Sequence, residues 1–401
     1  MKRRSVLLSC LLLLLLGLLV SGCWNRREMN DLAIAVGMGI DKADNGQYEV
    51  FVQVVDPSGV SARKPSGDRA PVTLYSAKGS TVFQAIRRMT TITPRKVYFS
   101  HLRIFVFGEE MAREGISKPL DFLSRDQELR TDFYLVVAKG TTARDILNFY
   151  TPLDKIPANK MYKSLEVSDK TWAPTVGVRL DDLITNMTSY GKDAVLTGIL
   201  IQGDREAGKK KKNVELIETQ ALLKYSGIAI FKGDKLMGWM NEVESKGYSN
   251  LTDNLQNTYV QIPCKSGGKA GVEVIHSKTK VKAKVTNNRP EINVFIRTEA
   301  NVADVECEMD TSQQSTLHQL EQAAEQVMIS HSTKSLQRAQ AVGADIFGFG
   351  EAVHRAYPGY WNQHKERWSE LFKELPVNIQ VDLKIVRTGT IGNSFLHDVK
   401  E

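Results

Sequence analysis

The chain has 401 residues, of which 42% are hydrophobic and 25% are charged. This balance is typical of a folded protein of two or three domains and excludes a disordered chain. The formal charge of +7 falls to +4 without residues 1–22, which hold three cations and no acid. So small a surplus does not indicate a nucleic-acid binder, and it favours an anionic lipid surface only weakly.

The first 22 residues have the order of an export signal: a charged start, an apolar run and small residues before a cysteine. These parts are Lys2, Arg3 and Arg4, then the leucine-rich segment 6–20, then Ser21, Gly22 and Cys23. The apolar run would reach about 22 Å as a helix, short of the roughly 30 Å hydrocarbon core of a bilayer. The alternative reading is a permanent N-terminal membrane anchor.

The segment Val20-Ser21-Gly22-Cys23 resembles the lipobox of bacterial lipoproteins. The resemblance implies cleavage between Gly22 and Cys23 and a diacylglyceryl group on the Cys23 thiol. Two acyl chains hold a protein stably on a membrane, whereas one chain holds it only marginally. We therefore predict a lipid anchor at Cys23 on the outer face of the membrane, since no later apolar run approaches spanning length.

Two further cysteines, Cys264 and Cys307, remain in the mature chain. Outside the cytoplasm they could form a disulfide, or each could be a small core residue, and the sequence leaves both possibilities open. The chain has no CxxC motif and no Cys/His spacing typical of a metal site. We accordingly expect no metal and no cofactor.

Residues 23–193 are predicted to form an N-terminal α/β domain, because strand and helix patterns alternate along them. The first two strands, Leu32–Ile40 and Tyr48–Val55, flank an Asp44-Asn45-Gly46 hairpin turn. A loop follows at 58–70, and Pro152, Pro157 and Pro174 indicate a long irregular connection. The remaining predicted elements are helices over 81–91, 109–123, 141–150 and 180–189 and strands over 102–107 and 133–138.

Residues 194–270 are predicted to form a small β-rich middle domain, and 271–396 a C-terminal α+β domain. The middle domain contains a strand at 195–201 and a hairpin of 228–231 with 236–239. In the C-terminal domain, lysines at even positions from Lys278 to Lys284 alternate with apolar residues, which is typical of a strand with one solvated face. Strands at 278–285, 291–298 and 377–385 and helices at 317–342 and 361–375 predict an antiparallel sheet with helices packed on one face.

Several segments resemble the C subunits of spore germinant receptors, the Ger(x)C lipoproteins (GerAC, GerBC and GerKC). They are, in chain order, Cys23–Glu28, Asp31–Ile34, Gly37–Asp41, Ser100–Leu102, Glu109–Ile116, Leu120–Asp126, Ala344–Glu351 and Trp361–Trp368. Each segment alone is a weak signal, but together they cover most of the mature chain in the family's order. The chain is therefore identified from its sequence as a member of this family.

The resemblance implies a non-catalytic subunit of a nutrient germinant receptor in the inner membrane of the dormant spore, needed for germination. It also implies contacts with integral membrane A and B subunits, membrane association through the lipid on Cys23, and an α+β fold of three mixed α/β domains behind the cleaved signal peptide. The lysine run at 209–212 and the loop at 58–70 match no family feature. No nucleic-acid partner is expected.

Two other classes of protein remain as alternatives. For an enzyme, the candidates are His318 with Glu321 and Glu351 with His354, each pair three residues apart, a spacing that places both side chains on one helix face. Such pairs are more often solvated edges, caps or subunit contacts, and no HExxH, GxSxG or Walker motif accompanies them.

The second alternative is a lipid-anchored solute-binding protein of a transporter. Its aromatic candidates, Tyr360, Trp361 and Trp368, lie in a helical stripe that core packing alone explains. The lysine run at 209–212 either contacts lipid headgroups or forms a solvated loop, and the second reading is the more common one.

Overall fold

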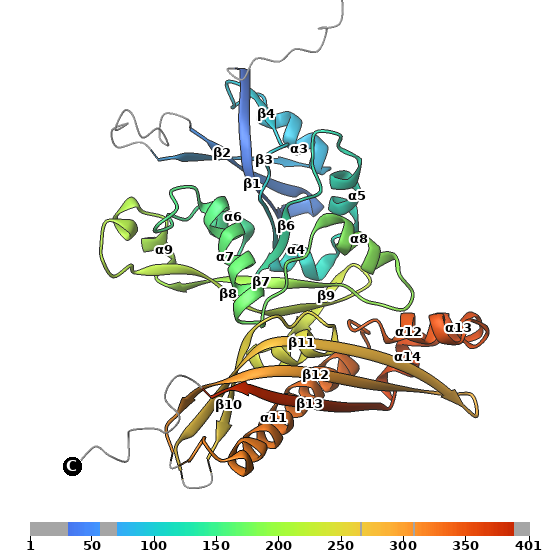
Figure 1. Cartoon of the computed structure of the whole chain (residues 1–401). Helices are drawn as coiled ribbons and strands as arrows, with labels where there is room; N and C mark the ends of the chain where they lie inside the picture. Colours follow the sequence, from blue (N-terminus) through green and yellow to red (C-terminus); the bar gives the residue numbers. More distant parts are fainter. Residues whose placement is uncertain (1–30, 57–69, 265–266, 308, 389–401) are drawn as a thin grey trace, which may run out of the picture.

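The computed structural model describes residues 31–56, 70–264, 267–307 and 309–388. They form a nine-stranded sheet in the order β3-β2-β1-β5-β6-β7-β8-β9, with β4 paired to β1, and a four-stranded sheet in the order β10-β11-β12-β13. The two sheets lie at opposite ends of the molecule (Figure 1). Residues 1–22 and Cys23 lie outside the described residues, as does nearly all of the predicted loop at 58–70.

The large sheet is built around β1 (Leu32–Lys42), which pairs antiparallel with β2 (Tyr48–Val55). The predicted hairpin turn is confirmed: it forms η2 (Asp44–Gly46), with Asn45 and Gly46 both at positive φ. On its other side, β1 runs parallel to β4 (Lys96–Tyr98) at its start and to β5 (Ile104–Gly108) further along. The half-exposed β3 (Val72–Gly79), which the sequence did not predict, extends the sheet beyond β2.

The four helices predicted for this region are present, the one over 109–123 as two separate helices. They are α3 (Val82–Met89), α4 (Glu109–Glu114), α5 (Ser117–Arg125), α6 (Ala143–Leu147) and α8 (Leu180–Thr188), with β6 (Tyr134–Ala138) as the next parallel strand. Gly115 separates α4 from α5, because it has a φ of 139° that other residues rarely adopt.

The prediction of an irregular connection between Pro152 and Pro174 is wrong, because most of it is the fifteen-residue helix α7 (Pro157–Thr171). Pro157 begins this helix, at a position where the missing N–H has no intrahelical partner to lose. Met161 and Leu165 of α7 are fully buried, in a hydrophobic cluster that also contains residues of α6 and of the central strands.

The strands predicted for the middle region continue the large sheet. They are β7 (Val195–Gly203), β8 (Ala221–Lys232) and β9 (Lys235–Trp239), and β7 pairs parallel with β6. The boundary expected at residue 194 therefore falls inside one sheet. Between β7 and β8 the chain forms two short elements, α9 (Arg205–Gly208) and η3 (Lys211–Val214), and the lysine run begins directly after α9 and ends within η3.

The small sheet contains β10 (Thr258–Pro263), β11 (Lys269–Thr286), β12 (Arg289–Val305) and β13 (Val377–Arg387). The predicted period of two in β11 is confirmed, with its even-numbered lysines exposed. The expectation of an antiparallel sheet is wrong for the last pair, since β13 runs parallel to β12. The helices between the two strands return the chain to the end where β12 begins, and such a crossover places the next strand parallel.

The helices of the second half are α10 (Glu242–Leu251), α11 (Gln314–Val342), α12 (Phe349–Ala356), α13 (Pro358–His364), η4 (Lys365–Arg367) and α14 (Trp368–Lys373). The long predicted helix is confirmed as α11, whereas the single helix expected over 361–375 is divided among the last three elements. One hydrophobic cluster includes residues of both sheets and of these helices, so the two sheets share a continuous core.

Candidate functional site

Two of the segments that resemble the germinant receptor family contain a buried aspartate that binds backbone amides. In the first, the Asp41 carboxylate at the end of β1 accepts hydrogen bonds from the N–H groups of Ala143 (2.8 Å) and Arg144 (3.1 Å). These are the first two residues of α6, whose N–H groups have no partner within the helix. Burial raises the pKa of Asp41 to about 6 despite these two bonds. Asp41 therefore fixes α6 against the sheet.

In the second segment, Asp345 is 1% exposed and is enclosed by five N–H donors. Its Oδ1 accepts from the backbone of Phe347, Gly348 and Phe349 at 3.0–3.2 Å. Its Oδ2 accepts from the Gly350 backbone at 2.7 Å and from the Trp368 indole at 2.8 Å. The carboxylate thus holds the turn that begins α12 and ties it to α14.

The same turn joins the two halves of the molecule. The Asp345 N–H donates to the Asp193 carboxylate (2.8 Å), and the Asp193 N–H donates to the Asp345 carbonyl (2.7 Å). Beside this pair, the Glu351 N–H donates to the Gly191 carbonyl at 3.2 Å. A Cβ on Gly350 would lie 2.6 Å from the Gly191 Cα, so this approach requires glycine. We call residues 189–193 and 344–351 the junction.

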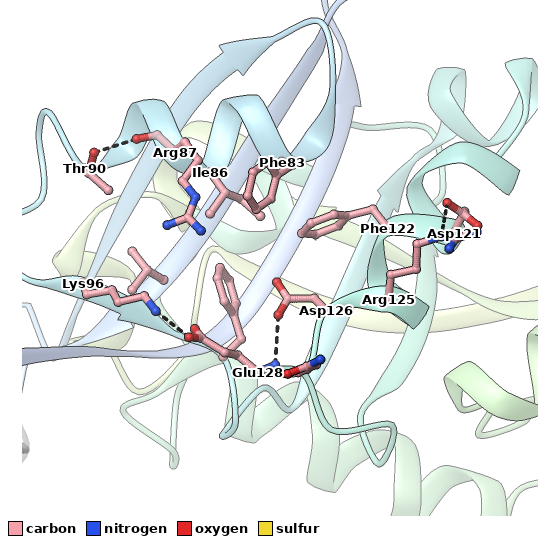
Figure 2. Close-up of a pocket in the computed structure, with 13 residues that line it drawn as sticks. Phe83, Ile86, Arg87, Thr90, Lys96, Asp121, Phe122, Arg125, Asp126 and Glu128 are labelled. Atoms are coloured by element: carbon pink, nitrogen blue, oxygen red, sulfur yellow. Dashed lines mark hydrogen bonds and ion pairs between the residues drawn. The ribbon is translucent and has the colours of Figure 1, made fainter. Parts of the chain in front are cut away.

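A cavity of about 520 Å³ lies at the other end of the large sheet, between α3, α5 and β4 (Figure 2). Phe83 of α3 and Phe122 of α5 face each other across it, with ring centroids 6.2 Å apart. Ile86 and Val97 continue the apolar wall. This groove was not predicted, although Phe83 lies outside the buried stripe of Val82, Ala85 and Met89 and so must point away from the sheet.

The charges around the groove are mostly paired. Lys96 forms an ion pair with Glu128, and Arg125 donates from Nε to the Asp121 carboxylate at 2.9 Å. Arg87 differs: its guanidinium lies 4.7 Å from the Phe83 ring centroid, and within the described ranges no carboxylate lies at ion-pair distance from it. The groove thus combines aromatic rings with a cation, Arg87, that has no ion-pair partner among the described residues, and Asp126 also lines it.

The residues proposed for an enzyme are engaged in other contacts. His318 lies 3.4 Å from Glu321 but is exposed, and the Glu321 carboxylate also accepts from the Ile385 backbone. Glu351 and His354 are not brought together, since Glu351 accepts from the Ser189 hydroxyl and His354 stacks on Trp361. Among the described residues, no group of His, Cys, Asp or Glu is arranged to hold a metal ion.

The other residues singled out in the sequence have structural contacts. Trp361 and Trp368 are 4% and 2% exposed and pack edge to face, so both belong to the core. In the lysine run, Lys209 pairs with Asp145 (3.0 Å) and Glu206 (2.7 Å), and Lys211 lies near Glu215. The pair with Asp145 links the end of α9 to α6, and the other two are local.

Cys264 and Cys307 form a disulfide, with their Cα atoms 6.4 Å apart. The bond joins the end of β10 to the end of β12 across β11, so it closes one end of the small sheet. Neither spacing nor composition could show this, because the pairing depends on the order of strands in the sheet. In the part of the chain that the structure describes, no helix has the length and apolar character needed to cross a bilayer.

Comparison with known proteins gives a consistent result over nearly the whole chain. A family model described as spore germination protein N-terminal domain matches residues 25–201, and one described as spore germination B3/GerAC like, C-terminal, matches residues 226–389. Spore germination protein KC of Bacillus subtilis (strain 168) is 32% identical over 408 residues, which is 99% of each chain.

More distant similarity extends the same pattern. Spore germination protein B3 of Bacillus subtilis (strain 168) is 26% identical over 383 residues, covering 94% of this chain and 96% of the relative. Among solved structures, the crystal structure of the GerBC protein superimposes with a TM-score of 0.57 at 21% identity, covering 87% of this chain and 97% of that one. At this identity the structural likeness establishes the mixed α/β fold.

Proposed function

The chain belongs to the GerAC-like family of spore germination proteins, and from this premise we infer that it is the lipid-anchored, non-enzymatic C subunit of a nutrient germinant receptor. The observation that carries this proposal is the match over 99% of both chains to a spore germination protein. The subunit would reside on the outer face of the inner spore membrane and act through contacts with integral membrane A and B subunits.

The position of β1 limits how far an anchor at Cys23 would let the folded body lie from the membrane. The first described strand begins at Leu32, so eight residues separate Cys23 from the large sheet. Fully extended, eight residues reach about 27 Å. An anchored Cys23 would therefore keep the folded body close to the membrane and raise its effective concentration near integral partners.

A non-enzymatic role is supported by the hydrogen bonds of three carboxylates, which bind the backbone of neighbouring elements. Asp41 and Asp345 bind backbone amides, and Glu321 binds the backbone of β13. These carboxylates hold elements together, so their hydrogen-bonding capacity is not directed at a cavity. The junction stabilises the arrangement of the two sheets, and the groove is a surface at which another molecule could bind.

The experiment that tests the proposal is affinity purification of the native protein from spore membranes in mild detergent, followed by mass spectrometry. We expect two polytopic membrane proteins in near-equal amounts with it. Recovery of the protein alone, or together with an ABC-type permease, would contradict the receptor assignment and favour the solute-binding alternative.

The matched control is the Cys23→Ala variant, which removes the lipid and leaves the folded domains unchanged. We expect this variant to leave the membrane fraction, to recover less of the two partners, and to retain the thermal stability of the parent protein. Normal membrane retention and normal germination of spores carrying it would show that Cys23 is not the anchor.

A further inference from the structure

The first residues of β1 place one end of the large sheet nearest to Cys23. Leu32 pairs with Lys96 of β4, and Ile34 pairs with Tyr98. Figure 1 shows β4 and α3 at the end of the sheet where β1 begins, and the small sheet at the opposite end of the molecule. The surface formed by α3 and β4 therefore lies at the end of the sheet where β1 begins, eight residues after Cys23 in the sequence.

That surface exposes two large apolar side chains, Phe83 on α3 and Ile92 in the turn after it, which are 50% and 54% exposed. Single exposed apolar residues are common, but these two lie nine positions apart, and Phe83 also lines the apolar groove. Together with Arg87, Arg88 and Arg95 they form what we call the α3 face.

The α3 face is basic. Arg87, Arg88 and Arg95 are all exposed, and within the described ranges none has a carboxylate at ion-pair distance. Arg88 donates from Nη1 to the Lys78 carbonyl, and Arg87 lies over Phe83. Of the three acids that line the groove, Asp121 and Glu128 are paired with Arg125 and Lys96, and Asp126 accepts the Glu128 backbone N–H at 2.9 Å.

The way α3 packs on the sheet determines which of its side chains are exposed. Thr81 caps α3 by accepting from the Gln84 N–H, and Val82, Ala85 and Met89 are buried against the sheet. Phe83 and Arg87, four residues apart, therefore share the outward side of the helix. Arg87 and Arg88 also lie in the last turn, where cations favourably oppose the helix dipole.

We propose that the α3 face docks on an anionic phospholipid surface, with Phe83 and Ile92 entering the interface and the three arginines meeting lipid phosphates. The inference rests on the proposed lipid anchor, which sets the distance to the membrane. A guanidinium binds phosphate through paired hydrogen bonds, and Arg87 can do so without breaking an ion pair. Each cation near an anionic surface raises partitioning by about fivefold.

Depth measurements on the mature, lipidated protein in vesicles test the docking. A nitroxide is attached to Phe83→Cys in one sample and to Phe295→Cys in the other. Phe295 is a matched control at the far end of the molecule, because it is 38% exposed and also has a cation, Lys282, over its ring. Cys264 and Cys307 do not react, because they form the disulfide.

In phosphatidylcholine vesicles with about 30% phosphatidylglycerol, we expect the label at position 83 to lose collisions with a water-soluble nickel chelate several-fold. The label at position 295 should remain fully accessible, and both labels should be accessible in pure phosphatidylcholine. Replacing Arg87, Arg88 and Arg95 with Gln should restore access at position 83. Replacing Lys280, Lys282 and Lys284 with Gln should not.

Two results would overturn the docking: a label at position 83 that stays water-accessible in anionic vesicles that retain the protein, or one that is shielded only when the integral subunits are added. The second would mean that a protein partner, and not lipid, covers the α3 face. Release of the protein from vesicles at high salt, which screens the arginines but not acyl chains, would instead contradict the lipid anchor.

Discussion

The carboxylates of Asp41 and Asp345 each accept hydrogen bonds from backbone N–H groups, and a glycine near each carboxylate makes this arrangement possible. A Cβ on Gly108 would lie 2.0 Å from Asp41 Oδ1, so a larger residue there would displace the carboxylate. At Asp345, Gly348 adopts a φ of 75°, which lets successive N–H groups converge on one oxygen. Gly108 and Gly348 thus leave room for the two carboxylates.

Asp41 predicts a measurable pH dependence. Its pKa is raised by burial to about 6 in the folded protein, against about 3.9 in an unfolded chain. The folded state therefore retains a proton that the unfolded state releases, and this carboxyl's contribution to stability falls as pH rises between about 4 and 6. Asp41→Asn lacks this carboxyl and therefore lacks this decrease. As pH rises from about 4 to 6, the free energy of unfolding of the variant should rise more steeply, or fall less, than that of the parent protein. Equal slopes in urea titrations of the two proteins would contradict the assignment.

Two substitutions of Trp368 separate the stability contributed by packing of its ring from that contributed by its hydrogen bond to Asp345. Trp368→Ala removes a buried ring and should cost about 3–5 kcal/mol of unfolding free energy. Trp368→Phe keeps most of the apolar volume but leaves Asp345 Oδ2 without its indole donor, at a cost of about 1–3 kcal/mol. Urea denaturation measures both. Unchanged stability of Trp368→Phe would show that the hydrogen bond contributes nothing measurable.

Among the elements, β13 is protected by a helix of the same domain. It is an outer strand of the small sheet, and such edges can pair with other chains. Two glutamates of α11 cover part of this edge: Glu321 accepts from the Ile385 N–H and Glu325 from the Leu383 N–H, both at 3.0 Å. The side chains take the place of a neighbouring strand.

Replacing Glu321 and Glu325 together with Ala should destabilise the protein by about 1–3 kcal/mol and promote self-association, because two edge N–H groups lose their acceptors. The double Gln variant is the matched control, since its side-chain carbonyls can still accept. Denaturation and sedimentation velocity measure the two effects. Monomeric behaviour and unchanged stability of the Ala variant would show that the edge needs no such cover.

The elements differ in how far the sequence could predict them. The alternating lysines of β11 and the apolar stripe of α11 were legible because each element has one solvated and one buried face. By contrast, α10 was missed because it buries small and polar residues, among them Gly247 and Asn250 against α11, and so has no apolar stripe. A Cβ on Gly247 would lie 2.1 Å from the His331 carbonyl, which shows how closely the two helices approach.

At the scale of the whole molecule, the junction couples the two sheets through a contact that depends on small residues. Gly350→Ala should cost about 1–3 kcal/mol, because its Cβ would overlap Gly191 and no flexible side chain can move away. Gly359→Ala is the control: it is also helical, has open space at Cβ, and should be neutral or stabilising by up to about 1 kcal/mol. Calorimetry measures both. Equal effects would mean that the junction is not tightly packed.

The sequence singled out one segment of this junction, but it did not show that this segment contacts residues 189–193. The stretch Ala344–Glu351 stood out through its likeness to the family, whereas Gly191 and Asp193 carry no local signal that they contact it. Their proximity depends on how α8 ends and on where β7 joins the large sheet. Likewise, the groove beside α3 is formed by three elements separated in sequence, so only the folded chain defines it.

The placement of β1 has a mechanical consequence. This strand, which begins eight residues after Cys23, is held by β2 on one side and by β4 and β5 on the other. A pull on the lipid along β1 would load its hydrogen bonds in shear, all at once, because they lie across the strand. If the membrane partners move relative to the lipid, the force would then reach the large sheet through β1 and move the folded body without unfolding it. Single-molecule pulling from the amino end tests this, and early rupture of the large sheet at low force would refute it.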